Sequence, residues 1–248
     1  MRRLLALFFL LALASTPAPA STNKITKESL DSQNKKRSYY LYVPDSIKAA
    51  TPAPLLLMLH GSGRNGLSLM EKWKDLADKE GIILAAPDAQ DSSHWSLHDD
   101  NPDFLRDVVE AVKSKSTVNP RRVYLFGHSA GATFALYVSL LESQYFAATA
   151  IHAGALQKDD DVFFDKAKRK IPLAIYVGTK DPFFPLDAVR ATRDMLVAHD
   201  FKAQLTEIPN HDHDYYVVAK DVNGGAWAFL KQYELSDEPY YKHYNFTN

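Results

Sequence analysis

The chain has 248 residues, 46% of them hydrophobic, so it is long enough to bury a sizeable core in one domain. Its formal net charge is −1 and it has no long basic or acidic run, which argues against nucleic acid or an anionic membrane surface as a partner. It contains no cysteine, which excludes disulfides, thiolate catalysis and cysteine-based zinc sites.

The first twenty residues have the pattern of a cleavable export signal. Met1–Arg3 is basic, Leu4–Ala14 is an uncharged apolar run, and small residues lead to Ala20. The apolar run is too short to span a bilayer, which needs roughly 20 such residues. We therefore predict a signal peptide over residues 1–20 and cleavage after Ala20. The remaining residues, 21–248, are expected to form a single domain that is secreted or periplasmic, without stable membrane insertion.

Two strands are expected next along the chain. Ile25–Leu30 and Lys36–Val43 alternate between apolar and polar residues, and the turn-forming residues Asp31–Asn34 separate them. This pattern predicts an N-terminal antiparallel hairpin. Beyond it, short apolar runs alternate with amphipathic segments. The expected strands are 55–59, 82–86, 122–126, 147–151, 173–177 and 202–208, and the expected helices are 69–79, 103–115, 133–142, 186–199 and 223–233.

This alternation predicts an α/β fold with a mostly parallel central sheet and helices on both faces. Only about twenty residues separate the strands 147–151 and 173–177, which leaves no room for a large lid. The segment after residue 233 has many tyrosines but no clear periodicity.

The segment Gly127-His128-Ser129-Ala130-Gly131 lies between a predicted buried strand and a predicted helix. A turn with the spacing Gly-x-Ser-x-Gly holds its serine in strained backbone geometry, with the hydroxyl exposed at the helix N-terminus. Free N–H groups there favour developing negative charge. The five-residue pattern alone is common, and a serine at this place can simply cap the helix. Its position between strand and helix favours Ser129 as a nucleophile.

A serine nucleophile needs a base that is held by an acid, and in this fold the order along the chain is Ser, acid, His. Asp181 directly follows a predicted strand, at the edge of the sheet where α/β sites form, and is the first candidate for the acid. Asp159–Asp161 is the second candidate, although three successive aspartates are typical of a solvated loop. His211 and His213 both follow the last predicted strand, and this reasoning leaves both open as the base.

The glycine-rich segment His60–Gly63 follows the first buried strand. Its backbone can turn the Ser62 N–H toward the serine, and the Ala130 N–H would be the second donor of an oxyanion hole. The alternative is a plain glycine turn. The pair His211 and His213 also raises the possibility of a metal site, but no third ligand with recognisable spacing accompanies it, so no metal or cofactor is predicted.

Together these segments resemble the α/β-hydrolase superfamily. Within it, the chain looks most similar to the poly(3-hydroxybutyrate) depolymerase and feruloyl-esterase-like group and to the esterase D (S-formylglutathione hydrolase) group. The resemblance covers Ser38 to about Tyr233. It rests on these landmarks: Leu59-His60-Gly61-x-Gly63, Gly81, Ala86-Pro87-Asp88, Gly127-His128-Ser129-Ala130-Gly131, Gly178-x-x-Asp181 and Asp212-His213-Asp214-Tyr215-Tyr216.

The last of these landmarks is similar to the Asp-His-Ser-Tyr-Tyr segment of the esterase D group, whose histidine is the catalytic base. The resemblance therefore implies His213 rather than His211 as the base. The chain also departs from its relatives. Ser62 stands where the secreted depolymerases and feruloyl esterases carry a cysteine, and their His-x-Trp-Pro ending is absent. These departures leave the substrate open.

The predicted function is that of a secreted serine hydrolase that cleaves carboxylic esters through an acyl-enzyme. The substrate is expected to be a small-molecule or polymer-linked ester, of a feruloyl, acetyl or polyester type. Trp95, Phe184 and His211 are candidate substrate-lining residues. A serine peptidase of the same fold and a non-catalytic binding protein are the alternatives. The sequence does not indicate the oligomeric state or whether the sequon at Asn245 is glycosylated.

Overall fold

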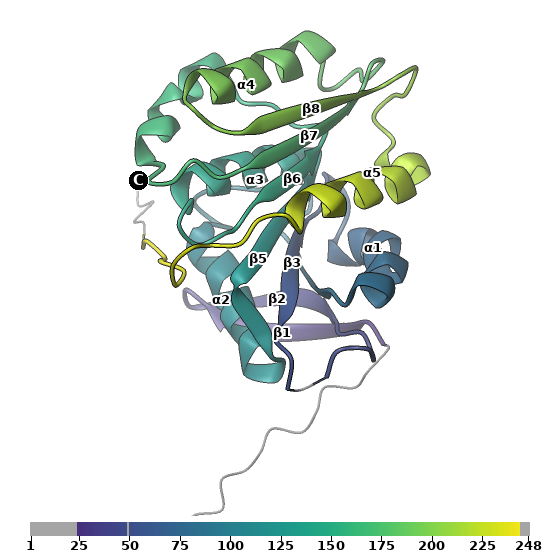
Figure 1. Ribbon diagram of the computed structural model, residues 1–248, viewed down its shortest axis with the longest axis vertical. Helices are drawn as coiled ribbons and strands as arrows, with labels where there is room; N and C mark the ends of the chain where they lie inside the picture. The colour runs from purple at the N-terminus through teal and green to yellow at the C-terminus, as the bar shows by residue number, and fades with distance from the viewer. Residues whose placement is uncertain (1–23, 49, 244–248) are drawn as a thin grey trace, which may run out of the picture.

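The computed structural model describes residues 24–48 and 50–243, which form a sheet with helices on both faces (Figure 1). The strands are β1 (Thr26–Ser32), β2 (Lys35–Tyr42), β3 (Ala53–Leu59), β4 (Ile83–Pro87), β5 (Val118–His128), β6 (Thr149–His152), β7 (Leu173–Gly178) and β8 (Ala203–Ile208). The helices are α1 (Gly66–Glu80), α2 (Pro102–Lys115), α3 (Ala130–Leu141), the 3-10 helix η1 (Lys158–Lys166), α4 (Leu186–Ala198) and α5 (Tyr215–Leu230).

Within the described residues the eight strands form one sheet in the order β1-β2-β4-β3-β5-β6-β7-β8. The pairs β1–β2 and β2–β4 are antiparallel, and the pairs from β4 to β8 are parallel. The predicted mostly parallel sheet with an N-terminal hairpin is therefore confirmed. The predicted signal peptide over residues 1–20 and the sequon at Asn245 lie outside the described residues.

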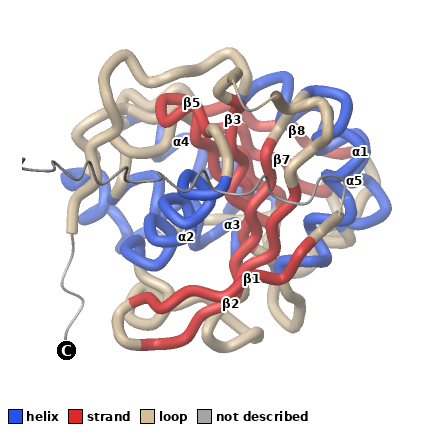
Figure 2. Tube along the Cα trace, turned by 90° about the horizontal axis from the view of Figure 1, so that it is seen from below, coloured by secondary structure: helices blue, strands red, loops and turns tan. Residues whose placement is uncertain are grey.

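Two hydrophobic clusters fill the two faces of the sheet. Helices α2, α3 and α4 cover one face, with Phe104 and Val189 in the core, and helices α1 and α5 cover the other, with Trp73 and Trp227 (Figure 2). Every residue of β3 is buried, as expected for a central parallel strand with helices on both sides. The carboxyl ends of the parallel strands thus rest on a closely packed support, which suits them to hold a site.

Helix α5 begins at Tyr215, eight residues before the predicted start at Asn223. The Asp214 side chain caps its first turn by accepting the Tyr216 N–H at 3.0 Å. Two successive glycines, residues 224 and 225, lie inside the helix. Because glycine has a low helix propensity, they obscure the helical pattern in the sequence. The extra turns place the start of α5 beside the end of β5, where the site forms.

The segment between β6 and β7 is the short helix η1 rather than the solvated loop expected around Asp159–Asp161. The Gln157 N–H donates to Asp160 Oδ2 at 2.6 Å, and the Tyr137 hydroxyl donates to the same carboxylate at 2.9 Å. These contacts tie the segment to α3 and leave no large lid. Within residues 24–48 and 50–243, none of the helices combines the length and the apolar character that crossing a bilayer requires.

The segment after α5 packs on the domain. The Tyr241 hydroxyl donates to Asp103 Oδ1 at 2.6 Å, and the Lys242 N–H donates to Glu142 Oε2 at 3.0 Å. Glu142 is only 1% exposed. Burial raises the pKa of its carboxyl to about 8, against an ordinary value of 4.5. The pH therefore affects the stability of this contact.

We expect the free energy of unfolding to fall as pH rises from about 4.5 to about 8. Because the folded state raises the pKa of Glu142, the stabilisation is complete below about pH 4.5 and is lost as pH rises through about 8. The loss over the whole range is on the order of 5 kcal/mol. Urea unfolding at pH 5 and pH 9 measures it. Glu142→Gln should remove this part of the pH dependence, whereas Glu238→Gln, an exposed change on the segment after α5, should retain it. An unchanged pH dependence in Glu142→Gln would contradict the assignment.

Candidate active site

Ser129 occupies the sharp turn between β5 and α3, with φ 57° and ψ −122°. This positive φ is unfavourable for a residue with a side chain and persists only where surrounding contacts hold it. The Ser129 N–H donates to the His152 carbonyl at 3.0 Å, and its own carbonyl accepts the N–H of Ala132 at 2.9 Å. The turn is therefore held from both sides, and it exposes the hydroxyl at the start of α3.

The oxyanion-loop candidate, His60–Gly63, lies directly against this turn. A Cβ added at Gly131 would be 2.1 Å from the Leu59 carbonyl oxygen, so only glycine lets α3 pack this closely on the end of β3. Neither the Ser62 N–H nor the Ala130 N–H is among the backbone donors with a partner in the described part of the chain. The role of these two N–H groups as an oxyanion hole stays a prediction, and their lack of an acceptor among the described residues is compatible with it.

His60 and Trp95 hold this loop in place. The His60 Nδ1–H donates to the Gly61 carbonyl at 2.9 Å, and its Nε2 accepts the Ala89 N–H at 3.1 Å. The Trp95 indole N–H donates to the His60 carbonyl at 2.8 Å. Burial lowers the pKa of His60, so its ring stays neutral and can both donate and accept. Trp95 therefore contacts the back of the loop, and it is not among the residues that line the pocket.

His213 connects Ser129 to Asp181. Its Nε2 lies 2.9 Å from Ser129 Oγ and its Nδ1 lies 2.7 Å from Asp181 Oδ2. Because an ionised carboxylate only accepts hydrogen bonds, the proton is on Nδ1, and Nε2 accepts the serine hydroxyl. The other oxygen, Asp181 Oδ1, accepts the N–H groups of Phe183 and Phe184, each at 2.9 Å. The Asp181 side chain is fully buried, so it has a fixed orientation.

Backbone contacts at the end of β7 bring Asp181 and the histidine segment together. The Thr179 N–H donates to the Ile208 carbonyl at 3.0 Å, and the Lys180 N–H donates to the His211 carbonyl at 2.8 Å. The His211 ring packs against His152, with ring centroids 5.9 Å apart. It does not line the pocket. Asp159–Asp161, the second candidate for the acid, lie in η1, which packs on α3 away from this contact.

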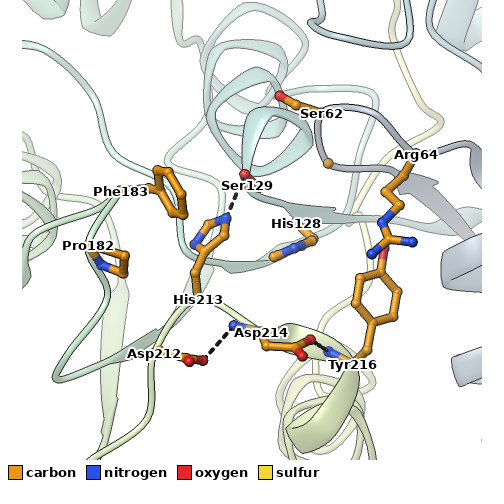
Figure 3. A pocket seen from close by; sticks show the side chains of 11 residues that line it. Ser62, Arg64, His128, Ser129, Pro182, Phe183, Asp212, His213, Asp214 and Tyr216 are labelled. Atoms are coloured by element: carbon orange, nitrogen blue, oxygen red, sulfur yellow. Dashed lines mark hydrogen bonds between the residues drawn. The ribbon is translucent and has the colours of Figure 1, made fainter.

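A cavity of about 360 Å³ opens above Ser129 (Figure 3). Its lining residues are Gly61, Ser62, Arg64, His128, Ser129, Pro182, Phe183, Asp212, His213, Asp214 and Tyr216. Phe184, a candidate lining residue, is not among them, because its ring stacks behind the His213 ring at 5.7 Å. Phe183 takes that place instead and is 72% exposed.

Sequence reasoning missed Arg64 and Tyr216. The Arg64 guanidinium lies 5.0 Å from the centre of the Tyr216 ring, and both line the cavity (Figure 3). Arg64 directly follows the oxyanion-loop candidate, and Tyr216 lies in the first turn of α5. The early start of α5 at Tyr215 places the tyrosine there, whereas the sequence pattern predicts a start at Asn223. The cavity thus has an apolar side at Pro182 and Phe183 and a polar side at Arg64 and Tyr216.

Potential metal ligands do not gather at this site. Within the described ranges, no three His, Cys, Asp or Glu side chains are grouped so that they could hold a metal ion. His211 and His213, which the sequence suggested as a metal pair, face different neighbours: His152 and Ser129 respectively. What the arrangement offers chemically is a hydroxyl, an imidazole that can accept its proton, and a buried carboxylate behind that imidazole.

The model of the dienelactone hydrolase family matches residues 83–233. Among curated relatives, a bifunctional acetylxylan esterase/xylanase from Neocallimastix patriciarum is 29% identical, and the match covers 60% of this chain and 22% of the relative. A poly(3-hydroxybutyrate) depolymerase from Ralstonia pickettii is 27% identical, over 57% of this chain and 34% of the relative. The chain thus spans between about a fifth and a third of the length of these curated relatives.

Solved structures share the fold at low sequence identity. The Staphylococcus aureus fluorophosphonate-binding serine hydrolase F superposes with a TM-score of 0.73 at 15% identity, covering 85% of this chain and 99% of that one. A ferulic acid esterase superposes with a TM-score of 0.67 at 16% identity, covering 84% and 98%. These likenesses show an α/β-hydrolase fold over most of the chain.

Proposed function

The chain belongs to the dienelactone hydrolase family, and from this premise we propose that it is a serine esterase that cleaves carboxylic esters through an acyl-enzyme. The observation that carries the proposal is the hydrogen-bonded series from Ser129 through His213 to Asp181, with distances of 2.9 and 2.7 Å. A hydroxyl, an imidazole and a buried carboxylate in this order are what acyl transfer to serine requires.

In the proposed mechanism, Ser129 attacks the ester carbonyl while His213 Nε2 takes the hydroxyl proton. Asp181 keeps the other ring proton on Nδ1 and stabilises the imidazolium that forms. The N–H groups of Ser62 and Ala130 bind the oxyanion of the tetrahedral intermediate. His213 then returns the proton to the leaving alcohol, and water attacks the acyl-enzyme by the same route. No cofactor takes part in this proposal.

The proposed substrates are small-molecule or polymer-linked esters of the acetyl, feruloyl or polyester type. The exposed ring of Phe183 beside His213, with ring centroids 4.9 Å apart, supports an apolar or aromatic group on one side. The absence of a lid domain between β6 and β7 within the described residues leaves the opening accessible to a polymer chain. The names of the curated relatives, an acetylxylan esterase and a polyester depolymerase, support the same classes. Export of the protein, through residues 1–20, is part of this proposal.

A substrate panel tests this proposal. The purified protein is assayed with p-nitrophenyl acetate, p-nitrophenyl butyrate and methyl ferulate beside peptide p-nitroanilides, and with a fluorophosphonate probe. We expect ester hydrolysis and labelling of the protein, without cleavage of the peptides, because the family and the curated relatives support ester substrates. Peptide cleavage that exceeds ester cleavage would favour a serine peptidase. Neither hydrolysis nor labelling would favour a non-catalytic binding protein.

A further inference from the structure

Two buried histidines lie behind the nucleophile. His128 is the last residue of β5 and His152 the last of β6, and the two are partners in the sheet register. Their Nδ1 atoms are 3.2 Å apart. The side chains are almost inaccessible, with exposures of 5% for His128 and 0% for His152. A hydrogen bond between two neutral imidazoles needs one donor and one acceptor, so a single proton lies between the two Nδ1 atoms.

The His128 ring lies beside the oxyanion-loop candidate and the His213 ring. Its Cδ2 lies 3.1 Å from the place that a Cβ of Gly61 would take, in the oxyanion-loop candidate. Its centroid is 5.1 Å from that of His213, and it directly precedes Ser129. Figure 3 shows the ring at the base of the cavity between His213 and Tyr216. The ring therefore acts as a spacer between the oxyanion loop, the nucleophile and the base.

His152 contacts the His128 ring on the side away from the cavity. Its ring bonds to His128 Nδ1, and its backbone carbonyl accepts the Ser129 N–H at 3.0 Å. It does not line the cavity. A change confined to the His152 side chain would thus release the His128 ring without touching a substrate or the backbone bond that fixes Ser129.

We propose that His128 and His152 are positioning residues: a neutral imidazole pair that keeps the oxyanion loop, Ser129 and His213 at their catalytic spacing. The proposal rests on the proposed function, since positioning is meaningful only for an active esterase. Misplacing reacting groups by about 1 Å can cost roughly 100-fold in rate. A hydrogen bond that fixes the ring orientation is therefore expected to affect turnover more than stability.

Neutrality of the pair matters because His213 must become positively charged. Burial is the main cause that lowers the pKa of His128 to about 3 and that of His152 to about 2. The titratable and charged groups that face the two rings are His211, His213, Tyr215, Tyr216, Arg64 and Asp181. Asp181 opposes this shift at His128, but its hydrogen bond is made to His213. No second imidazolium then forms beside His213, where it would oppose proton transfer.

Variants at His152 test the positioning role. His152→Leu removes the bond to His128 Nδ1, and we expect kcat to fall about 10- to 100-fold with little change in KM. His152→Asn retains a polar group near the position of Nδ1 and should restore most of the lost turnover. The rate of labelling by a fluorophosphonate should follow kcat in both variants.

The matched control is Thr149→Val on the same strand. Thr149 is fully buried and its hydroxyl lies 2.6 Å from that of Ser139, away from the site. We expect this change to lower Tm as His152→Leu does and to leave kcat unchanged. His152→Leu with wild-type kcat would overturn the proposal. If His152→Leu does not fold, His128→Phe takes its place, because it fills the ring volume without the Nδ1 bond and should lower kcat similarly.

Nitrogen-15 NMR of the imidazoles tests the protonation state in the wild-type protein. We expect one of the two Nδ1 atoms to carry a proton, the other to carry none, and neither ring to titrate between pH 5 and 9. Titration of either ring in that range would overturn the proposal. Failure of the proposed function is recognisable separately, as a wild-type protein that neither cleaves esters nor reacts with the fluorophosphonate.

Discussion

Ser129→Ala should abolish ester hydrolysis, with kcat lower by about six orders of magnitude and the fold retained. The reason lies in the turn: Ser129 Oγ is the nucleophile that His213 Nε2 contacts at 2.9 Å, and alanine leaves that imidazole without a proton to take. The backbone bonds that hold the turn come from the Ser129 N–H and carbonyl and do not need the hydroxyl. Initial-rate assays with p-nitrophenyl acetate, together with circular dichroism and Tm, measure both expectations.

Ser62→Ala is the matched control for this experiment. It removes a hydroxyl from the same cavity but keeps the Ser62 N–H, which is the group expected to bind the oxyanion. We therefore expect kcat within a few-fold of the wild type. A Ser129→Ala protein that keeps wild-type turnover would disprove the nucleophile assignment. An equal loss of kcat in both variants would show that the loss does not depend on a nucleophilic role of the Ser129 hydroxyl.

The parts that could be predicted from sequence are those that local pattern and strand order determine. The apolar runs at β3 and β4 predict strands buried on both faces, and the structure agrees. The position of Ser129 between a strand and a helix, and of Asp181 after a strand, follows from the common edge at which parallel strands end. Chain order therefore indicated that Ser129, Asp181 and the histidine segment after the last strand would meet, whereas the choice of His213 came from the resemblance to the esterase D group.

The remaining features depend on contacts between distant segments. Tyr216 lies beside Arg64 because α5 starts at Tyr215, where a cap at Asp214 begins a helix whose pattern two glycines had obscured. Trp95 is a candidate substrate-lining residue in the sequence, but its indole N–H donates to the His60 carbonyl at 2.8 Å and so contacts the oxyanion-loop candidate. Packing between distant segments determines where such side chains point. The spacing of residues along the sequence does not predict it.

The sheet register likewise paired two histidines that are far apart in sequence. His128 and His152 are separated by a whole helix and meet because β5 and β6 are neighbours with His128 opposite His152. Nothing in the local pattern around either residue distinguishes a paired buried histidine from one that fills core space. Pairing strands in register requires the fold, so this pair could not be predicted from the sequence.

His213→Ala should lower kcat by about six orders of magnitude, whereas His211→Ala should cost about tenfold or less. The two histidines lie two residues apart on one loop, so the comparison separates chemistry from loop stability. His213 bonds to both Ser129 and Asp181, while the His211 ring packs against His152. Loss of the His213 ring removes the base, and loss of the His211 ring removes packing behind the site.

Parallel assays of kcat and Tm for the two variants decide which histidine is the base. We expect His211→Ala to lose stability and to keep most of its turnover, because the backbone carbonyl of His211, which accepts the Lys180 N–H at 2.8 Å, is retained. The His213 side chain is more exposed than that of His211, 20% against 9%, so His213→Ala should lose less stability than His211→Ala. The reverse pattern, an inactive His211→Ala beside an active His213→Ala, would reassign the base and would require the loop to rearrange on substrate binding.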